Sequence, residues 1–322
     1  METITSRRHF RKFYLMLILI TVIFFLFGFV TLGLFIHLYY SNQFETRNYG
    51  LVGMFLLLVL GWLYIIYRHI KFAPSIRVCK DWITFNNSSP FYWRDLEKIE
   101  LTGKRPFLFF ADREGVLLKF KGQKERVFLD CMYTNTGQIK RFIQCVVIDK
   151  ASVADVKITH PDINETVHEK FVVYKGIQLL NFRGVLLCLI IGALLYASIL
   201  SRWRWGPLVF LSLLGAVSMV AISWSFYYFE VSDNYLLVRN HNLFWIKKLY
   251  RLTDIKEIVF EQQDKMPVCL RLITNDFESK LYPAATLRSK RWLQLKEDLE
   301  KKNIKVRNEC VTYEPFEFKL FQ

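Results

Sequence analysis

The chain repeats one plan twice: two long uncharged apolar segments, then a polar region with strand-like alternation. The apolar segments are 13–37 and 51–67 in the first copy, and 184–200 and 205–229 in the second. A helix needs about 20 apolar residues to cross a hydrocarbon core of about 30 Å. The pattern therefore predicts a multi-pass integral membrane protein with four transmembrane helices in two hairpins.

Two of these segments allow another interpretation. Segment 184–200 is near the lower length limit for a span, so a buried helix of a soluble domain or a re-entrant segment is the alternative. Segment 13–37 follows a basic start, as a signal peptide does. Its apolar run is much longer than the roughly 7–15 residues of a signal peptide, and no small-x-small cleavage site follows. We therefore expect an uncleaved helix there.

The sidedness of the helices follows from the distribution of Lys and Arg. The segments predicted to lie on one side carry many, whereas those on the other side carry three: Arg47, Arg202 and Arg204. Basic residues stay on the cytoplasmic side of a membrane. Both termini and both polar domains should thus be cytoplasmic, at the cell (inner) membrane. We expect the flanking cations to contact anionic lipid headgroups: Arg7, Arg8, Arg11, Lys12, Arg68, Lys71, Lys247, Lys248 and Arg251.

The formal net charge of +15 does not indicate a nucleic-acid-binding protein. Residues 72–178 contain 17 Lys and Arg against 13 Asp and Glu, and residues 230–322 contain 17 against 14. Neither region has the concentrated basic stripe that follows a phosphate backbone. The surplus charge lies mainly in the N-terminal tail and beside the membrane segments, so we expect no nucleic-acid partner.

Each polar region alternates apolar and polar residues with period two and ends in a pattern with helical period. This predicts an α+β protein in which each helix hairpin precedes a small β-barrel or sandwich closed by a C-terminal helix. Phe142 and Trp292 should be buried on those terminal helices, while the Lys140-Arg141 and Lys290-Arg291 pairs should lie on the solvated faces. The predicted boundaries are a tail and hairpin 1–71, a domain 72–150, a linker 151–183, a hairpin 184–229, a domain 230–305 and a tail 306–322.

Short sequence similarities support a duplication. Asp95-Leu96-Glu97-Lys98-Ile99 aligns with Asp254-Ile255-Lys256-Glu257-Ile258, and Lys140–Gln144 aligns with Lys290–Gln294. Both matches fall at the same place in the order of predicted strands. Asp95 and Asp254 could suggest paired catalytic carboxylates, but Asp at the start of a strand commonly bonds its own backbone, and we favour that interpretation.

The segments 229–239 and 252–258 resemble the bacterial pleckstrin-homology-like (PH-like) domains of small membrane proteins. The shared pattern is a strand, an Asp/Asn turn, a second strand, a basic strand and then Asp-Ile-x-x-Ile. Segments 82–85 and 92–96 are similar but looser. The resemblance implies a PH-like fold in both halves. It implies no catalytic residues, and it does not by itself imply phosphoinositide binding.

No pattern in the sequence indicates an enzyme. The six cysteines and six histidines are dispersed without metal-ligand spacing, and no phosphate loop or nucleophile elbow is present. We expect no catalytic residues, no cofactor and no metal. The sequence therefore favours a membrane-anchored interaction or scaffold protein whose partners are membrane lipids and another protein. The alternative is an accessory or regulatory subunit of a membrane transport or export system.

Overall fold

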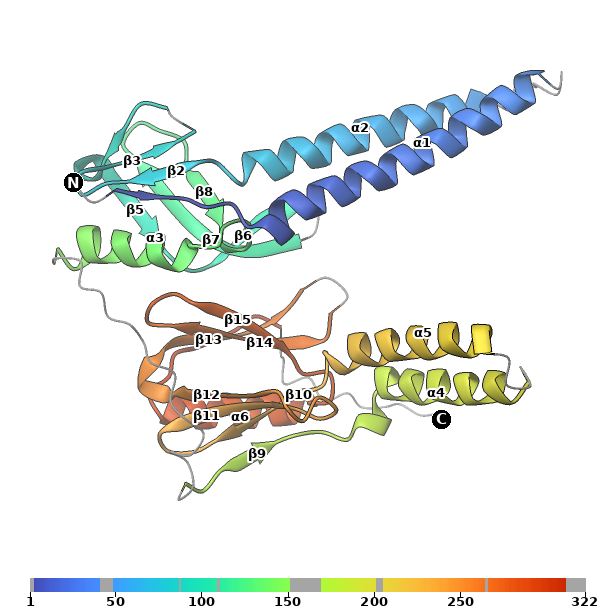
Figure 1. Ribbon diagram of the computed structural model, residues 1–322. Coiled ribbons are helices and arrows are strands. Elements are labelled where there is room, and N and C mark those ends of the chain that lie inside the picture. Colours follow the sequence, from blue (N-terminus) through green and yellow to red (C-terminus); the bar gives the residue numbers. More distant parts are fainter. Residues whose placement is uncertain are drawn as a thin grey trace, which may run out of the picture. The chain divides into compact units, whose positions relative to one another are not determined.

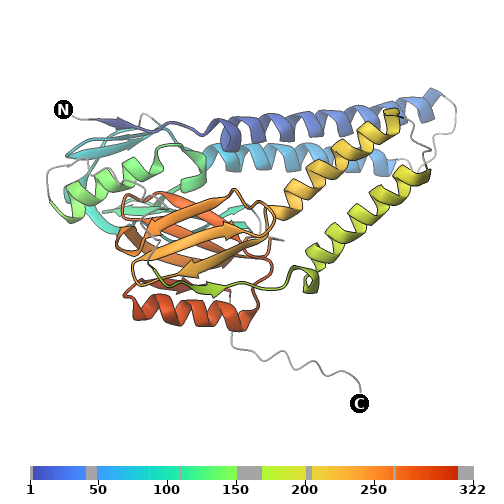
Figure 2. The same cartoon turned by 60° about the horizontal axis from the view of Figure 1, so that its bottom comes forward.

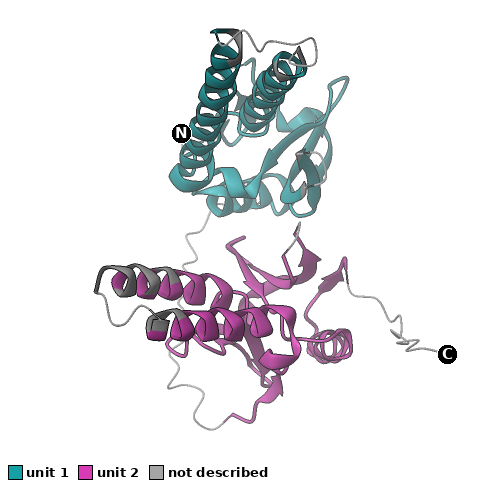
Figure 3. Cartoon of the chain, turned by 90° about the vertical axis from the view of Figure 1, so that its right-hand side faces the viewer, with its two compact units in different colours: residues 1–154 teal, residues 155–322 magenta. Residues whose placement is uncertain are grey.

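The chain forms two compact units, residues 1–154 and residues 155–322 (Figure 3). In each unit a pair of apolar helices is followed by β-strands and then by a shorter helix (Figure 1). The computed structural model describes residues 3–40, 49–86, 88–108, 111–150, 169–200, 205–263 and 266–310.

In unit 1 the helix pair is inserted between the first two strands of an antiparallel sheet. β1 comes before the helices, and β2 comes after them and pairs with β1, with Ile4 opposite Val78. Ile76 and Val78 of β2 are buried while Arg77 between them is exposed, which is the alternation of a half-buried strand. The sheet order is β1-β2-β3-β4. The elements are β1 (Ile4–Thr5), the π-helix η1 (Phe10–Leu15), α1 (Met16–Tyr40), α2 (Tyr49–Lys71), β2 (Ile76–Val78), β3 (Trp82–Phe85) and β4 (Phe91–Tyr92).

A second sheet and a helix complete unit 1. The long strand β7 pairs with β5, β6 and β8. The helix α3 buries Ile139, Phe142 and Ile143, so the predicted burial of Phe142 is confirmed. The elements are β5 (Leu96–Glu100), β6 (Lys104–Leu108), β7 (Ala111–Phe120), β8 (Arg126–Leu129) and α3 (Thr136–Ile143).

Unit 2 has its helix pair at the same place in the strand order. β9 precedes the helices, and β10 follows them and pairs with β9, with Phe229 opposite Tyr174. The two sheets have the orders β12-β11-β10-β9 and β15-β14-β13-β16. The elements are β9 (Val172–Tyr174), α4 (Phe182–Leu200), α5 (Trp205–Ser223), β10 (Tyr227–Val231), β11 (Tyr235–Asn240), β12 (Lys247–Arg251), β13 (Ile255–Gln262), β14 (Val268–Thr274), β15 (Ser279–Pro283), α6 (Ser289–Lys301) and β16 (Val306–Asn308).

The core of unit 2 lies between its sheets and α6, the helix seen along the lower edge of Figure 2. Trp292 is buried against the rings of Phe229 and Phe260, with ring centroids 5.7 and 4.7 Å away. Its predicted burial is confirmed. Lys290 on the same helix is exposed, as predicted.

The prediction of four transmembrane helices in two hairpins is wrong. Within the described part of the chain, two helical segments are long and apolar enough to cross a membrane, Phe10–His37 and Val52–Lys71. α4 and α5 have 19 residues each, which at 1.5 Å per residue is about 28 Å. The expected β-barrel or sandwich is replaced in each unit by two separate four-stranded sheets.

Candidate membrane-contact surface

The helices α1 and α2 present apolar side chains to their surroundings along their length. In each of the spans Phe10–His37 and Val52–Lys71, only 6% of the most apolar stretch is buried. The core helix of a soluble protein would be mostly buried instead. These two helices are therefore suited to contact with the hydrocarbon interior of a membrane.

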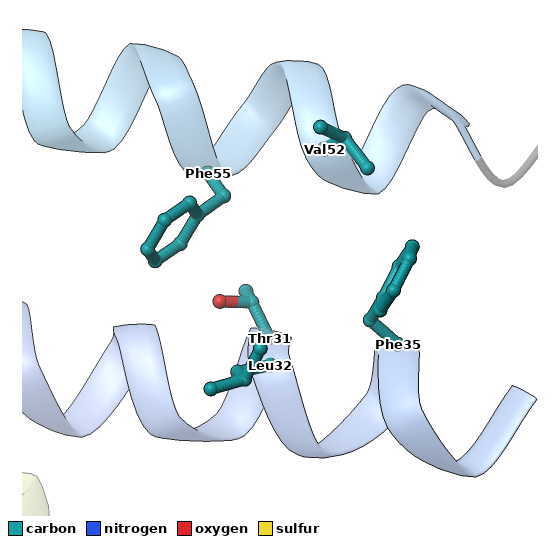
Figure 4. Close-up of a pocket in the computed structure, with 5 residues that line it drawn as sticks. All are labelled: Thr31, Leu32, Phe35, Val52 and Phe55. Atoms are coloured by element: carbon teal, nitrogen blue, oxygen red, sulfur yellow. The ribbon is translucent and has the colours of Figure 1, made fainter. Parts of the chain in front are cut away.

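Aromatic stacking and a hydrogen bond hold α1 against α2. The rings of Phe24 and Trp62 stack with centroids 4.8 Å apart, and the Trp62 indole N–H donates to the Thr21 hydroxyl at 3.4 Å. Farther along the pair, an apolar pocket opens between the two helices (Figure 4). Its lining is Thr31, Leu32 and Phe35 of α1 with Val52 and Phe55 of α2.

At its base, the helix pair is fastened to the β-sheets of unit 1. The Arg8 guanidinium donates to the carbonyl of Ala73 through Nε and Nη2, at 3.2 and 3.0 Å, and lies over the Phe13 ring. The Arg68 guanidinium donates to the carbonyl of Phe107 at the end of β6. Arg8 thus joins the segment before η1 to the segment after α2, and Arg68 joins α2 to β6.

A buried histidine fills the space between these arginine contacts. The ring of His69 stacks on Phe13 at 5.0 Å and packs against Phe107 at 5.9 Å. Its Nε2 lies 3.3 Å from the Phe13 carbonyl. The backbone and aromatic groups of η1, α2 and β6 therefore meet at the base of the helix pair.

Four other cations of unit 1 are predicted to contact lipid: Arg7, Arg11, Lys12 and Lys71. Arg7 uses its backbone to continue the sheet edge, donating to Asn135 Oδ1 at 2.8 Å and accepting from the Thr134 N–H. Arg11 and Lys12 are exposed on η1. Lys71 is also exposed, with its ammonium 5.5 Å from the Tyr67 ring. Arg7, Arg11, Lys12 and Lys71 are all exposed, so these four cations are accessible near the base of the helices.

In unit 2 the structure separates three cations that the sequence grouped together. Lys247 and Lys248 are exposed at the start of β12, opposite Arg239 and Val238 at the end of β11. Arg251 is at the other end of β12, opposite Tyr235. A strand rises about 3.4 Å per residue, so Arg251 lies about 14 Å from Lys247. The two lysines lie at the end of the sheet from which the helices leave, and Arg251 does not.

A hydrogen-bonded junction joins this end of the sheet to both helices of unit 2. The Asn242 amide donates to the Ser223 hydroxyl at the end of α5, and its oxygen accepts from Gln178 just before α4, both at 2.8 Å. The Asn240 amide donates to the Ser223 carbonyl at 2.8 Å. His241 packs on the Tyr228 ring at 4.7 Å. No local sequence pattern predicts this junction, because its residues are far apart along the chain.

Two further features of the junction limit which residues it accepts. A Cβ atom on Gly176 would overlap the carbonyl of Thr286, so only glycine fits at this position. Burial lowers the pKa of His241, and the charge of Lys175 lowers it further. Both features indicate a tightly packed connection between the β9–α4 segment and the segment before α6.

The Lys140-Arg141 pair does not lie wholly on a solvated face. Lys140 is 1% exposed, and its ammonium pairs with Asp130 Oδ2 at 2.5 Å. The prediction was wrong because the helix pattern carries no information about Asp130, which a 3-10 turn brings under α3. Lys140 is thus a structural cation of the interior and is not available to bind a phosphate.

The described residues contain no group of three or more His, Cys, Asp or Glu side chains that could hold a metal ion. Asp95 and Asp254 lie in different units, and each ends a 3-10 turn just before a strand. The surfaces described above are apolar, aromatic and basic. Searches against protein-family models and curated protein sequences find no match to the chain.

Proposed function

We propose that this protein is a membrane-anchored interaction protein of the scaffold type. α1 and α2 cross the membrane as one hairpin, and the two β-rich units present binding surfaces to a protein partner or to lipid headgroups. The observation that carries the proposal is the insertion of the helix pair between β1 and β2, with Arg8 and Arg68 bonded back to the domain. A domain that is only tethered to its membrane anchor is joined to it by a flexible linker. A rigid connection fixes which face of the domain meets its partner.

Charge supports a cytoplasmic position for both units. Arg11 and Lys12 precede α1 and Lys71 ends α2, whereas the segment between the helices has one basic residue, Arg47. Basic residues remain on the cytoplasmic side. With one hairpin in the inner membrane of a bacterial cell, everything before α1 and after α2 is then cytoplasmic.

The order of elements supports a PH-like architecture for each unit. A four-stranded sheet, β1-β2-β3-β4 or β9-β10-β11-β12, precedes a second sheet and a helix that packs its apolar face inward. In both units the helix pair occupies the connection between the first and second strands. In unit 1, the proposed membrane anchor thus takes the place of the loop that would join those strands in a soluble domain.

Local detail supports a duplication. A 3-10 turn ends at Asp95 in unit 1 and at Asp254 in unit 2. The strand that follows has a register irregularity at its second residue in both cases, between Leu96 and Lys98 and between Ile255 and Glu257. The Asp95 and Asp254 carbonyls each accept, at 2.9 Å, the backbone N–H of the residue that follows the neighbouring strand. These donors are Lys121 after β7 and Asn275 after β14. Such irregularities are retained within families.

Cysteine labelling in intact cells tests the membrane arrangement. Cysteines introduced at Gln123 and Lys290, both exposed, should resist an impermeant maleimide until the membrane is opened. A cysteine at Thr46, between α1 and α2, should react at once and serves as the positive control. The parent chain with its six native cysteines gives the background. Labelling of the Gln123 site in intact cells would refute the proposed orientation.

A second candidate function is that of an accessory or regulatory subunit of a transport or export system. The apolar pocket between α1 and α2 favours it, since a helix of a membrane partner could fill the space beside Phe35 and Val52. Photo-crosslinking from position 52 in native membranes, followed by purification, separates the candidates. A stoichiometric crosslink to a multi-span protein favours the subunit, whereas crosslinks to lipid alone favour the scaffold.

A further inference from the structure

We propose that the β11–β12 loop of unit 2, with Phe244 and Trp245 at its tip, inserts into the interface of an anionic lipid bilayer. The inference deepens the proposed membrane-anchored function and rests on it. The loop comprises residues 241–246, since β11 ends at Asn240 and β12 begins at Lys247.

The two aromatic side chains are the exposed tip of an otherwise fixed loop. Phe244 is 74% exposed and Trp245 is 65% exposed, and their rings meet edge to face at 5.0 Å. On either side of them, Leu243 is buried and Ile246 packs against the core of unit 2. The loop is thus anchored by its apolar ends and directs its two largest apolar groups outward. Tryptophan and other aromatic residues accumulate where protein meets the headgroup region of a membrane.

The base of the loop is bonded to both helices of the unit. The Asn240 side-chain oxygen accepts the backbone N–H groups of Asn242 and Leu243, at 3.0 and 2.9 Å. The Asn242 side chain then joins Gln178 and Ser223, as described above. The loop tip therefore has a set position relative to the start of α4 and the end of α5.

Exposed apolar residues continue from the loop to the bases of these helices. Leu179 and Leu180 precede α4, Phe182 begins it and is 79% exposed, and Trp224 follows α5. Because Gln178 and Ser223 bond to Asn242, these residues lie near the base of the loop, and exposed apolar residues gathered in one region mark a contact with a membrane or a partner. Its continuity with α4, whose own apolar side chains are largely exposed, favours lipid.

The charges around the tip favour anionic lipid in particular. Lys247 and Lys248 directly follow the loop, and Lys175 lies close to His241 at its start. Lys247 and Lys248 form no ion pair among the described residues. Asp233 lies in the turn at the opposite end of this sheet, and Glu230 of β10 pairs with Arg239 at 3.5 Å. Aromatic groups flanked by cations match an anionic headgroup layer over an apolar interior.

Fluorescence quenching by brominated lipid tests the insertion in the full-length chain. The protein is reconstituted into vesicles of phosphatidylcholine and phosphatidylglycerol, with or without bromine near the top of the acyl chains. The emission of Trp245 is obtained as the difference between the native chain and Trp245→Phe. We expect this emission to be blue-shifted and to fall in the brominated vesicles, and the fall to shrink when phosphatidylglycerol is omitted or Lys247 and Lys248 are both changed to Glu.

Two matched difference measurements make the result decisive. Trp62→Phe reports on α2, and Trp93→Phe reports on the domain of unit 1, where the Trp93 indole bonds to the Cys79 carbonyl. Quenching of Trp62 without quenching of Trp245 would overturn the loop insertion and leave the membrane anchor intact. Quenching of neither would overturn both. A Trp245 that is shielded from aqueous acrylamide but unaffected by brominated lipid would show that protein covers the loop, which also overturns the proposal.

Discussion

Trp292 is the residue whose truncation most directly tests the packing of unit 2. Its side chain is 1% exposed and lies between Phe229 and Phe260, so both sheets of the unit depend on it. Its indole N–H has no hydrogen-bond partner among the described residues. We predict that Trp292→Ala strongly destabilises unit 2, and that Trp292→Phe does so far less.

The magnitude follows from two opposing effects. Truncation of a buried large aromatic to Ala costs about 3–5 kcal/mol. A buried unsatisfied polar group costs about 1–3 kcal/mol, and both substitutions remove it. We therefore expect about 3 kcal/mol for Trp292→Ala, near the lower end of the range, and at most about 1 kcal/mol for Trp292→Phe. A loss of about 3 kcal/mol is a large share of the roughly 5–15 kcal/mol that stabilises a domain.

Thiol labelling under denaturant measures the loss in the full-length chain in detergent. Cys269 of unit 2 is fully buried and Cys79 of unit 1 is 3% exposed, so mass spectrometry of the labelled peptides reports the opening of each unit. Trp292→Ala should shift the labelling of Cys269 and leave that of Cys79 in place. The exposed control Lys290→Ala, on the same helix, should change the unfolding free energy by less than about 0.5 kcal/mol.

Two outcomes would refute this reasoning. If Lys290→Ala opened Cys269 while Trp292→Ala did not, α6 would present its other face to the sheets. If Trp292→Phe cost as much as Trp292→Ala, the ring that phenylalanine retains would contribute nothing, and the intact indole, with its unpartnered N–H, would be required for stability.

Three further predictions follow from buried groups and close contacts. Asp130→Asn should destabilise unit 1 by about 3–5 kcal/mol, because it leaves the Lys140 ammonium buried without its carboxylate, whereas the double change Asp130→Asn with Lys140→Met, which removes both charges, should cost much less; denaturant titration measures both. Gly176→Ala should lower the stability of unit 2 by about 1–3 kcal/mol through overlap with the backbone it faces, while Gly53→Ala, with open space around it, should be tolerated. Burial lowers the pKa of His241 in the folded chain, so the neutral ring favours folding above the ordinary histidine pKa, and this stability is lost as the pH falls from there through the lowered pKa. The melting temperatures at pH 7.5 and 5.5 should therefore differ less in His241→Gln than in the native chain.

Periodic patterns predicted the parts of the fold in which neighbours along the chain decide the structure. The apolar face of α6 placed Trp292 correctly because i, i+3 and i+4 positions share one side of a helix. The same argument failed for Lys140, although the dipeptide Lys-Arg is identical in the two copies. Burial of a lysine depends on a carboxylate partner, and that partner is ten residues away in a turn.

The strands before the helix pairs were missed for a similar reason. β1 has two residues and β9 has three, which is too short for an alternation to be recognised. Their partners β2 and β10 lie beyond the whole helix pair. The junction at Asn242 was also missed, because a polar residue in a turn is ordinary until its two distant partners are known.

Because β1 and β9 belong to the sheets, each domain begins before its helix pair. A fragment that begins at residue 72 lacks β1, and one that begins at residue 230 lacks β9, including Tyr174, which is 1% exposed and donates its hydroxyl hydrogen to Asp298 of α6. β2 or β10 would then become the unpaired edge of its sheet in place of the short strand β1 or β9, which favours aggregation. The helix pair is thus an insertion within a domain rather than an appendage to it. A force or ligand that moves the helices must act on both neighbouring strands at once, so the position of each helix pair is coupled to the fold of its unit.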